Sequence, residues 1–151
     1  MNGSIEMALF VVKEVMLNLR RIMMWLHNLP KKDRVGLWKD VFKWKGGRQR
    51  SGYRTFLLFF NPFFIPFHVL LLHYPAWSYT PFHVDPVPGK RHYRFNLSFW
   101  LPKIGGTPLI VKPYINTRRI QFFRSDLCPH SVSTVYEGTR WVLSIGWVLK
   151  E

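Results

Sequence analysis

The chain has little of three things: cysteine, acidic residues and long apolar runs. Cys128 is the only cysteine among 151 residues, so no internal disulfide forms and a secreted, disulfide-stapled fold is not indicated. The longest apolar run near the N-terminus, residues 7–12, is far shorter than the roughly 18 residues of a membrane span. No signal-peptide pattern is visible. We therefore expect a soluble, cytoplasmic protein without a transmembrane segment.

Acidic residues number 8 against 22 Lys and Arg, which gives a formal net charge of +14. A field of this sign attracts polyanions such as nucleic acid, anionic membrane or acidic protein segments. It can also be a general trait of a source proteome, so it does not by itself identify a ligand. With 48% apolar and 17% aromatic residues, the chain is too hydrophobic to be disordered, and its aromatics favour strands.

The N-terminal third has a different character from the rest. Residues 4–28 place apolar side chains at helical spacing, after a possible N-cap at Ser4 and before Pro30, which predicts a helix. Its apolar stripe suits packing on a sheet or lying on a membrane surface. Residues 31–54 interleave nine basic residues with aromatics. This pattern is typical of single-stranded nucleic-acid binding, but also of a solvated face whose aromatics belong to the core.

From Tyr53 onward the apolar pattern becomes strand-like. Short segments are separated by Pro, Gly and Asn, and they comprise YRTFLLFF, PFHVLLLHY, RHYRFNLSFWL, TPLIVKPY, RRIQFF, HSVSTVY and TRWVLSIGWVL. Many short strands with closely spaced turn signals predict a β-sandwich or barrel. We expect a single domain over residues 1–151, with a helical, basic extension at 1–50 and a β core at 51–151.

The segment PFHVDP, residues 81–86, holds the first candidate site residues. In a strand, residues two apart point to the same face, so His83 and Asp85 are predicted to converge. His130 is the candidate for a third ligand. Two histidines and one carboxylate on one face of an octahedron suit a non-haem Fe(II) centre. Arg140 follows ten positions after His130, and a turn around Gly138 would return this guanidinium, a natural carboxylate partner, to the same place.

This order of residues resembles that of the Fe(II)/2-oxoglutarate-dependent dioxygenases. The stretch FFRSDLCPHSVSTVYEGTRWVLSIGW looks like the prolyl-4-hydroxylase-type members, including its GTR and its trailing GW. The segment RFNLSFWLPKIGG is similar to the aspartyl/asparaginyl β-hydroxylase branch. The resemblance covers roughly residues 70–149. One departure is that some members have Ser two positions after the arginine, where this chain has Val142.

The resemblance implies a double-stranded β-helix, a jelly roll of cupin type, with the N-terminal helices packed on one sheet. It implies that His83, Asp85 and His130 bind Fe(II) and that Arg140 binds the distal carboxylate of 2-oxoglutarate. Arg94 or Asn96 would line the cosubstrate or substrate pocket. No catalytic residue beyond the metal ligands is expected. O2 is the other cosubstrate, ascorbate is a possible stimulant, and the reaction is hydroxylation of a C–H bond.

Three readings of the function stay open from the sequence. The resemblance to prolyl and aspartyl hydroxylases favours a polypeptide side chain as substrate. The net charge and the basic, aromatic stretch at 31–54 favour a nucleic acid or nucleotide. The third reading is a jelly-roll binding module without catalysis, against which the complete set of His83, Asp85, His130 and Arg140 argues.

Overall fold

The computed structural model describes residues 41–61 and 66–150. The chain divides into two compact units, Met1–Asp40 and Val41–Glu151, and the described residues all belong to the second. The helix expected at 4–28 and residues 31–40 of the basic stretch lie outside the described residues. The N-terminal helices and the single-domain organisation therefore stay predictions.

The described residues form strands and turns, which confirms a mainly β chain. The strands are β1 (Trp44–Gly46), β2 (Arg54–Asn61), β3 (Phe67–Tyr74), β4 (Thr80–His83), β5 (Lys90–Trp100), β6 (Ile104–Gly105), β7 (Pro108–Ile110), β8 (Ile115–Asn116), β9 (Ile120–Arg124), β10 (His130–Val132), β11 (Val135–Glu137) and β12 (Arg140–Lys150). Within these residues no helix has the length and apolarity that crossing a membrane requires.

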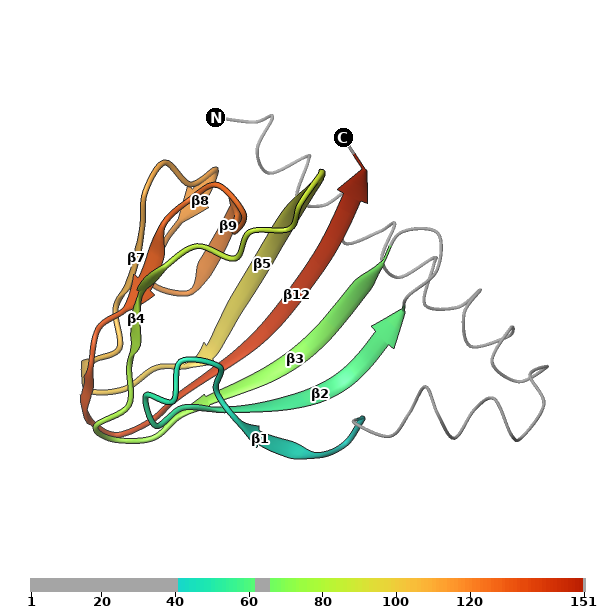
Figure 1. The fold of residues 1–151 in the computed structure, drawn as a ribbon. Coiled ribbons are helices and arrows are strands. Elements are labelled where there is room, and N and C mark those ends of the chain that lie inside the picture. The colour runs from blue at the N-terminus through green and yellow to red at the C-terminus, as the bar shows by residue number, and fades with distance from the viewer. Residues whose placement is uncertain (1–40, 62–65, 151) are drawn as a thin grey trace. The chain divides into compact units, whose positions relative to one another are not determined.

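A seven-stranded antiparallel sheet carries most of the long strands, in the order β1-β2-β3-β12-β5-β9-β8 (Figure 1). The last strand, β12, lies between β3 and β5. It pairs with β3 from Arg140↔Tyr74 onward, and with β5 as far as Lys150↔Lys90. The start of β12 is thereby fixed beside the end of β3, which decides where Arg140 lies.

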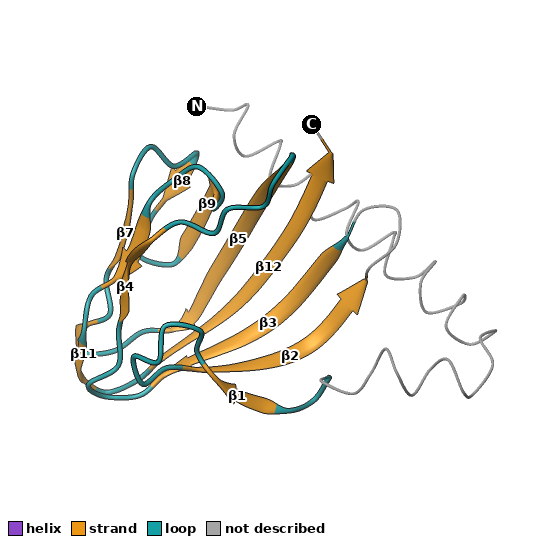
Figure 2. Ribbon diagram, in the orientation of Figure 1, coloured by secondary structure: helices purple, strands orange, loops and turns teal. Residues whose placement is uncertain are grey.

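Two smaller sheets complete the fold, a three-stranded sheet in the order β4-β10-β7 and a two-stranded sheet of β11 and β6. Figure 2 shows β4 and β7 on one side and β5, β12, β3 and β2 on the other. A pocket lined by residues of both larger sheets lies between them. Since β4 is an edge strand, Pro81 is tolerated in it although proline cannot donate to a strand ladder.

Strand alternation divides the side chains of the large sheet between its two faces. On β12 the residues Val142 and Ser144 are buried on the pocket side, while Trp141 and Leu143 point to the other face. Buried apolar residues form one cluster around Tyr53, Tyr74 and Val142. A second cluster joins Ile110, Phe123 and Cys128, so apolar packing supports the pocket from both sheets.

The structure departs from the expected strands at several places. The sheet begins at β1, before residue 51, where the β core was expected to start. β4 was not among the expected segments, and the predicted segment at 130–136 divides into β10 and β11. These strands have three or four residues, too few to carry a periodic pattern, and pairing with distant segments determines them instead.

Candidate metal centre

Three side chains predicted as metal ligands meet at one wall of the pocket. His83 ends β4 and His130 begins β10, and the two are direct cross-strand partners. Asp85 lies just beyond β4, where its backbone N–H donates to the carbonyl of Ser125 over 2.8 Å. One nitrogen or oxygen ligand atom from each of His83, Asp85 and His130 lies within 4.8 Å of the others, so one divalent ion could contact all three.

Backbone carbonyls orient both imidazoles. Nδ1 of His83 lies 2.8 Å from the carbonyl of Pro81, and Nδ1 of His130 lies 2.9 Å from that of Cys128. Because a carbonyl only accepts, each Nδ1 must donate, and each Nε2 is left to bind another group. Nε2 of His83 lies 3.7 Å from Oδ1 of Asp85, and Nε2 of His130 lies 3.9 Å from Oδ2.

The protonation states suit a metal as well. Burial lowers the pKa of His130 to about 4, so its ring is neutral near pH 7. Burial alone would raise the pKa of Asp85, but the charge of Arg94 and its neighbours lowers it below its ordinary value. A divalent ion needs neutral imidazoles and an ionised carboxylate. The protonation states of His130 and Asp85 fit such an ion.

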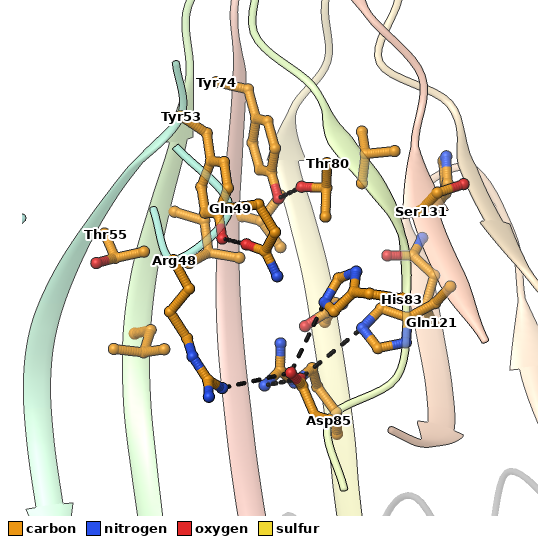
Figure 3. Close-up of a pocket in the computed structure, with 18 of the residues that line it drawn as sticks. Arg48, Gln49, Tyr53, Thr55, Tyr74, Thr80, His83, Asp85, Gln121 and Ser131 are labelled. Carbon is orange, nitrogen blue, oxygen red and sulfur yellow. Dashed lines mark hydrogen bonds and ion pairs between the residues drawn. The ribbon is translucent and has the colours of Figure 1, made fainter. Parts of the chain in front are cut away.

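Two arginines hold the carboxylate of Asp85 from different sides. Nη2 of Arg94, on β5, lies 2.9 Å from Oδ2. Nη1 of Arg48 lies 3.4 Å from Oδ1, and it comes from the exposed turn after β1 (Figure 3). Arg94 was expected to line the cosubstrate or substrate pocket. It is among the lining residues, where its guanidinium engages the candidate metal ligand Asp85, and its role toward a cosubstrate stays a prediction.

The pocket extends from these three residues toward the start of β12 and has a volume of about 230 Å³. Arg140 lies in its lining and is only 2% exposed. Nη2 of Arg140 donates to Oγ of Ser98 at 2.8 Å and to Oε1 of Gln121 at 3.4 Å. None of the ion pairs among the described residues includes Arg140.

A buried guanidinium without an acidic partner is costly, because burial disfavours the charged form. Accordingly, burial lowers the pKa of Arg140. The ring of Tyr74 lies beneath it, with 5.6 Å from the guanidinium carbon to the ring centroid. This neutral surrounding leaves room for an anionic ligand as the partner of Arg140.

Several other polar atoms of the described residues are buried without a hydrogen-bond partner. They are Nε2 of His92, Nε of Arg94, Oδ1 of Asn96, Nε2 of His130, Nε of Arg140 and Oγ of Ser144. Four of these six residues line the pocket. Buried polar groups are normally paired, so these atoms are available to water or to a polar ligand in the pocket. Asn96 is among the lining residues, and its expected contact with a cosubstrate or substrate stays a prediction.

Two stacked tyrosines form another part of the lining. The rings of Tyr53 and Tyr74 are 5.0 Å apart. The hydroxyl of Tyr53 donates to Oε1 of Gln49, and that of Tyr74 pairs with Oγ1 of Thr80 at 3.0 Å. Burial raises the pKa of Tyr53 to about 12, so it remains a hydrogen-bond donor. Figure 3 shows these groups on the side of the pocket away from Asp85.

Sequence reasoning did not single out Arg48, Ser98 or Gln121 as site residues. Gln121 is fully buried within a strand whose neighbours Phe122 and Phe123 are apolar. A single amide in such a strand is a signal of an inward-facing polar contact. Arg48 left no comparable signal, because its approach to Asp85 depends on how the turn after β1 folds over the pocket.

Comparisons with known proteins give similarities to solved structures only. No protein-family description matches the sequence, and no curated protein does. The chain is similar to a prolyl-4-hydroxylase from Pseudomonas putida, with 19% identity over 57% of this chain and 52% of that one and a TM-score of 0.44. It is also similar to the collagen prolyl hydroxylase of Paramecium bursaria Chlorella virus-1, determined with 2-oxoglutarate. The identity is 17% over 57% of this chain and 60% of that one, and the TM-score is 0.41.

A sugar phosphate isomerase of the cupin superfamily from Silicibacter pomeroyi is also similar, with 13% identity, 70% and 68% of the two chains covered and a TM-score of 0.39. The chain spans about half the length of the Pseudomonas enzyme that it matches.

Proposed function

We propose that this protein is an Fe(II)- and 2-oxoglutarate-dependent oxygenase that hydroxylates a C–H bond, built on a double-stranded β-helix. One observation carries the proposal. A single pocket has a cluster of His83, Asp85 and His130 at one wall and the buried guanidinium of Arg140 at another. Among the described residues, this guanidinium has no acidic side chain as a partner. A metal-binding dicarboxylate is a ligand that suits both ends of such a pocket.

His83, Asp85 and His130 would hold the metal through two nitrogens and one oxygen. This donor set on one face leaves positions open for other ligands, as non-haem Fe(II) oxygenases require. The ring orientations come from the carbonyls of Pro81 and Cys128, so little side-chain freedom remains to be lost on binding. Fe(II) together with 2-oxoglutarate and O2 would supply the oxidation, giving the hydroxylated product, succinate and CO2.

Arg140 would bind the distal carboxylate of 2-oxoglutarate. Its Nη2 is already oriented by Ser98 and Gln121, and its Nε has no partner among the described residues. A carboxylate can take two hydrogen bonds from one guanidinium. Asn96, whose Oδ1 is unpaired, is the neighbouring residue that we assign to the same ligand. Val142 occupies the place of the serine found in some members and adds an apolar contact.

The remaining residues bind, orient and exclude water. Arg94 keeps the carboxylate of Asp85 ionised and fixes its direction through the 2.9 Å ion pair. Tyr53, Tyr74 and Leu72 cover one side of the pocket with buried rings and an apolar side chain. Restricting water in this way protects a reactive oxidant from side reactions. Arg48, on the exposed turn, is positioned at the opening where substrate would enter.

For the substrate, we take a polypeptide side chain as first candidate, on the resemblance of the C-terminal stretch to prolyl-4-hydroxylases. A nucleic acid is the second candidate. The observation favouring it is the excess of cations: among the described residues the acidic side chains are Asp85, Asp126 and Glu137, and each is paired with a basic residue.

The test is succinate formation from 2-oxoglutarate by the full chain with Fe(II), ascorbate and O2, in the presence of proline-containing peptides or single-stranded oligonucleotides. His130→Ala is the matched inactive variant, and Leu127→Ala, an exposed residue outside the pocket lining, controls for an unrelated substitution. We expect succinate only when metal and 2-oxoglutarate are both present. If the parent bound both the metal and 2-oxoglutarate but formed no succinate with any substrate class, the result would favour a binding module without catalysis. Failure to bind 2-oxoglutarate would refute the proposal.

A further inference from the structure

The large sheet carries a row of aromatic side chains on the face turned away from the pocket. Thr55, Leu72 and Val142 line the pocket, so their chain neighbours Phe56, His73 and Trp141 point to the opposite face. The aromatic stripe, as we call this row, consists of Phe42, Trp44, Phe56, His73, Trp141 and Phe99. It crosses β1, β2, β3, β12 and β5.

The members of the aromatic stripe contact one another in sequence across the strands. Ring centroids are 6.1 Å apart for Phe42 and Phe56, 5.0 Å for Trp44 and Phe56, and 6.0 Å for Trp44 and Trp141. The ring of His73 stacks on that of Trp141 at 4.2 Å, and Phe99 follows at 6.5 Å. The rings form one continuous surface rather than isolated exposed residues.

This surface is open within the described structure. Phe42 is 65% exposed, Trp44 46% and Phe99 51%. Single exposed apolar residues are ordinary, but a contiguous exposed apolar group marks an interaction site. Trp44 was one of the aromatics that the sequence left open between a core role and a binding role, and its exposure favours binding.

Among the described residues, a basic side chain adjoins the aromatic stripe and the acidic side chains lie elsewhere. Arg54 is the direct cross-strand partner of His73, and burial together with the charge of Arg54 lowers the pKa of His73. Lys43 is exposed and adjoins Phe42 and Trp44 in the sequence. The three acidic side chains of the described residues are engaged elsewhere, by Arg94, Arg124 and Lys103.

We propose that the aromatic stripe is a docking surface for single-stranded nucleic acid, with bases stacking on Trp44, Trp141 and Phe99 and phosphates meeting Lys43 and Arg54. Stacking rings beside cations are the means by which single strands are held without sequence preference. An acidic polypeptide would satisfy the cations but leave the ring faces without partners. A duplex would present its backbone and keep its bases stacked inside, out of reach of the rings.

This inference goes beyond the oxygenase proposal and does not depend on it, because the stripe and the pocket lie on opposite faces of the sheet. A nucleic acid held there would be either a substrate brought to the protein or a scaffold that holds a polypeptide substrate nearby. Binding should therefore need neither metal nor 2-oxoglutarate.

The experiment is a fluorescence anisotropy titration of a labelled oligothymidine with the full chain in the presence of EDTA, at low and at moderate salt. The parent should bind the single strand more tightly than a duplex of equal length. Trp44→Ala and Phe99→Ala should each weaken binding roughly tenfold, as loss of one stacking platform does. Phe82→Ala is the matched control, since Phe82 is 56% exposed but lies on the small sheet.

A second experiment tests the role of charge with the double variant Lys43→Glu/Arg54→Glu. Its control is Lys112→Glu, because Lys112 is exposed but lies outside the aromatic stripe. Each phosphate contact contributes about −0.7 to the slope of log affinity against log salt for single strands, so the double variant should flatten the slope by about 1.4 and Lys112→Glu should not. His130→Ala must bind like the parent, which separates this surface from the pocket.

Two results would overturn the inference. The first is no binding of the oligonucleotide by the parent at low salt. The second is binding that both aromatic variants retain in full and that polyglutamate displaces as well as a nucleic acid does. That second pattern would identify a purely electrostatic surface suited to acidic polypeptides.

Discussion

His83 and His130 face one another across the β4–β10 ladder, with ring centroids 4.3 Å apart and each Nδ1 held by a backbone carbonyl. Both rings therefore present Nε2 to the carboxylate of Asp85. Because the orientation is fixed by the backbone, a metal ion bound here would meet side chains that are already oriented.

Removing one of these rings should abolish tight metal binding. Loss of even an outer-shell partner costs about 10–100-fold in metal affinity, so we expect His130→Ala or His83→Ala to weaken Co(II) binding by more than about 100-fold. Anaerobic titration followed by Co(II) absorption measures this. The parent should bind one ion per chain and His73→Ala should match it. Equal affinity in His130→Ala would mean that the three side chains hold no metal.

Arg140→Gln should weaken 2-oxoglutarate binding while leaving Co(II) binding unchanged. Removing one partner of a desolvated ion pair costs roughly 2–5 kcal/mol, or about 30- to 4,000-fold in affinity. Calorimetric titration of 2-oxoglutarate into the Co(II)-loaded protein gives the affinity for 2-oxoglutarate, and the anaerobic Co(II) titration gives the affinity for the metal. Arg119→Gln is the control, since Arg119 donates to the backbone carbonyl of the same Ser98 over 3.4 Å. If the two variants bind 2-oxoglutarate alike, Arg140 is not the anchor.

The long strands could be predicted from sequence, and the short ones could not. β2, β3, β5 and β12 have eight to eleven residues, enough for β-branched and aromatic side chains to show a pattern between turn residues. β4, β6 and β8 have two to four residues. Their pairing is decided by partners far along the chain, which local sequence does not record.

The sequence indicated which residues lie in one pocket better than it indicated their local geometry. His83 and Asp85 were expected to share a face of one strand, yet β4 ends at His83. They converge because the N–H of Asp85 is anchored by the carbonyl of Ser125. The four residues that were expected together do share one pocket, but their roles in binding a metal and a cosubstrate stay predictions. They are His83, Asp85, His130 and Arg140. Arg94 illustrates the limit, since only the fold reveals that it pairs with Asp85.

Stability should fall as the pH drops below about 6.5, because the buried His92 and the half-buried His68 resist protonation. Burial lowers the pKa of His68 to about 3 and that of His92 to about 4, below the ordinary value near 6.5. At a pH between the folded pKa values and 6.5, each of these histidines binds a proton more readily in the unfolded chain than in the folded one, so acid favours unfolding. Above pH 6.5 both states are neutral and the effect vanishes.

At pH 5, His68 alone should cost roughly 2 kcal/mol of the free energy of unfolding relative to pH 8. His68→Gln removes this titration, and its urea-unfolding free energy should decline less between pH 8 and pH 5 than that of the parent. Because His68→Gln still contains His92, its free energy of unfolding should still decline to some extent between pH 8 and pH 5. His73→Gln, on the opposite face, should decline more nearly as the parent does. Parallel declines for His68→Gln and the parent would show that His68 is not protonated on unfolding.

Gly146 separates these same two histidines, and replacing it should destabilise the sheet. A Cβ at Gly146 would lie 2.5 Å from Cε1 and Nε2 of His68 and 2.9 Å from Nε2 of His92. The two rings come from β3 and β5, the strands on either side of β12, so the added methyl group must displace at least one of them. We expect Gly146→Ala to lower the free energy of unfolding by roughly 1–3 kcal/mol, the usual cost of overpacking.

The matched control is Gly46→Ala, another strand glycine without positive φ, whose added Cβ would meet nothing within 4 Å. Urea unfolding at pH 8, where both histidines are neutral, should leave Gly46→Ala within about 0.5 kcal/mol of the parent. His68→Ala should relieve part of the cost of Gly146→Ala, because the ring that the methyl group strikes is gone, so the two changes together should destabilise less than their sum. Strict additivity of the two substitutions would refute a clash between Gly146 and His68 as the cause.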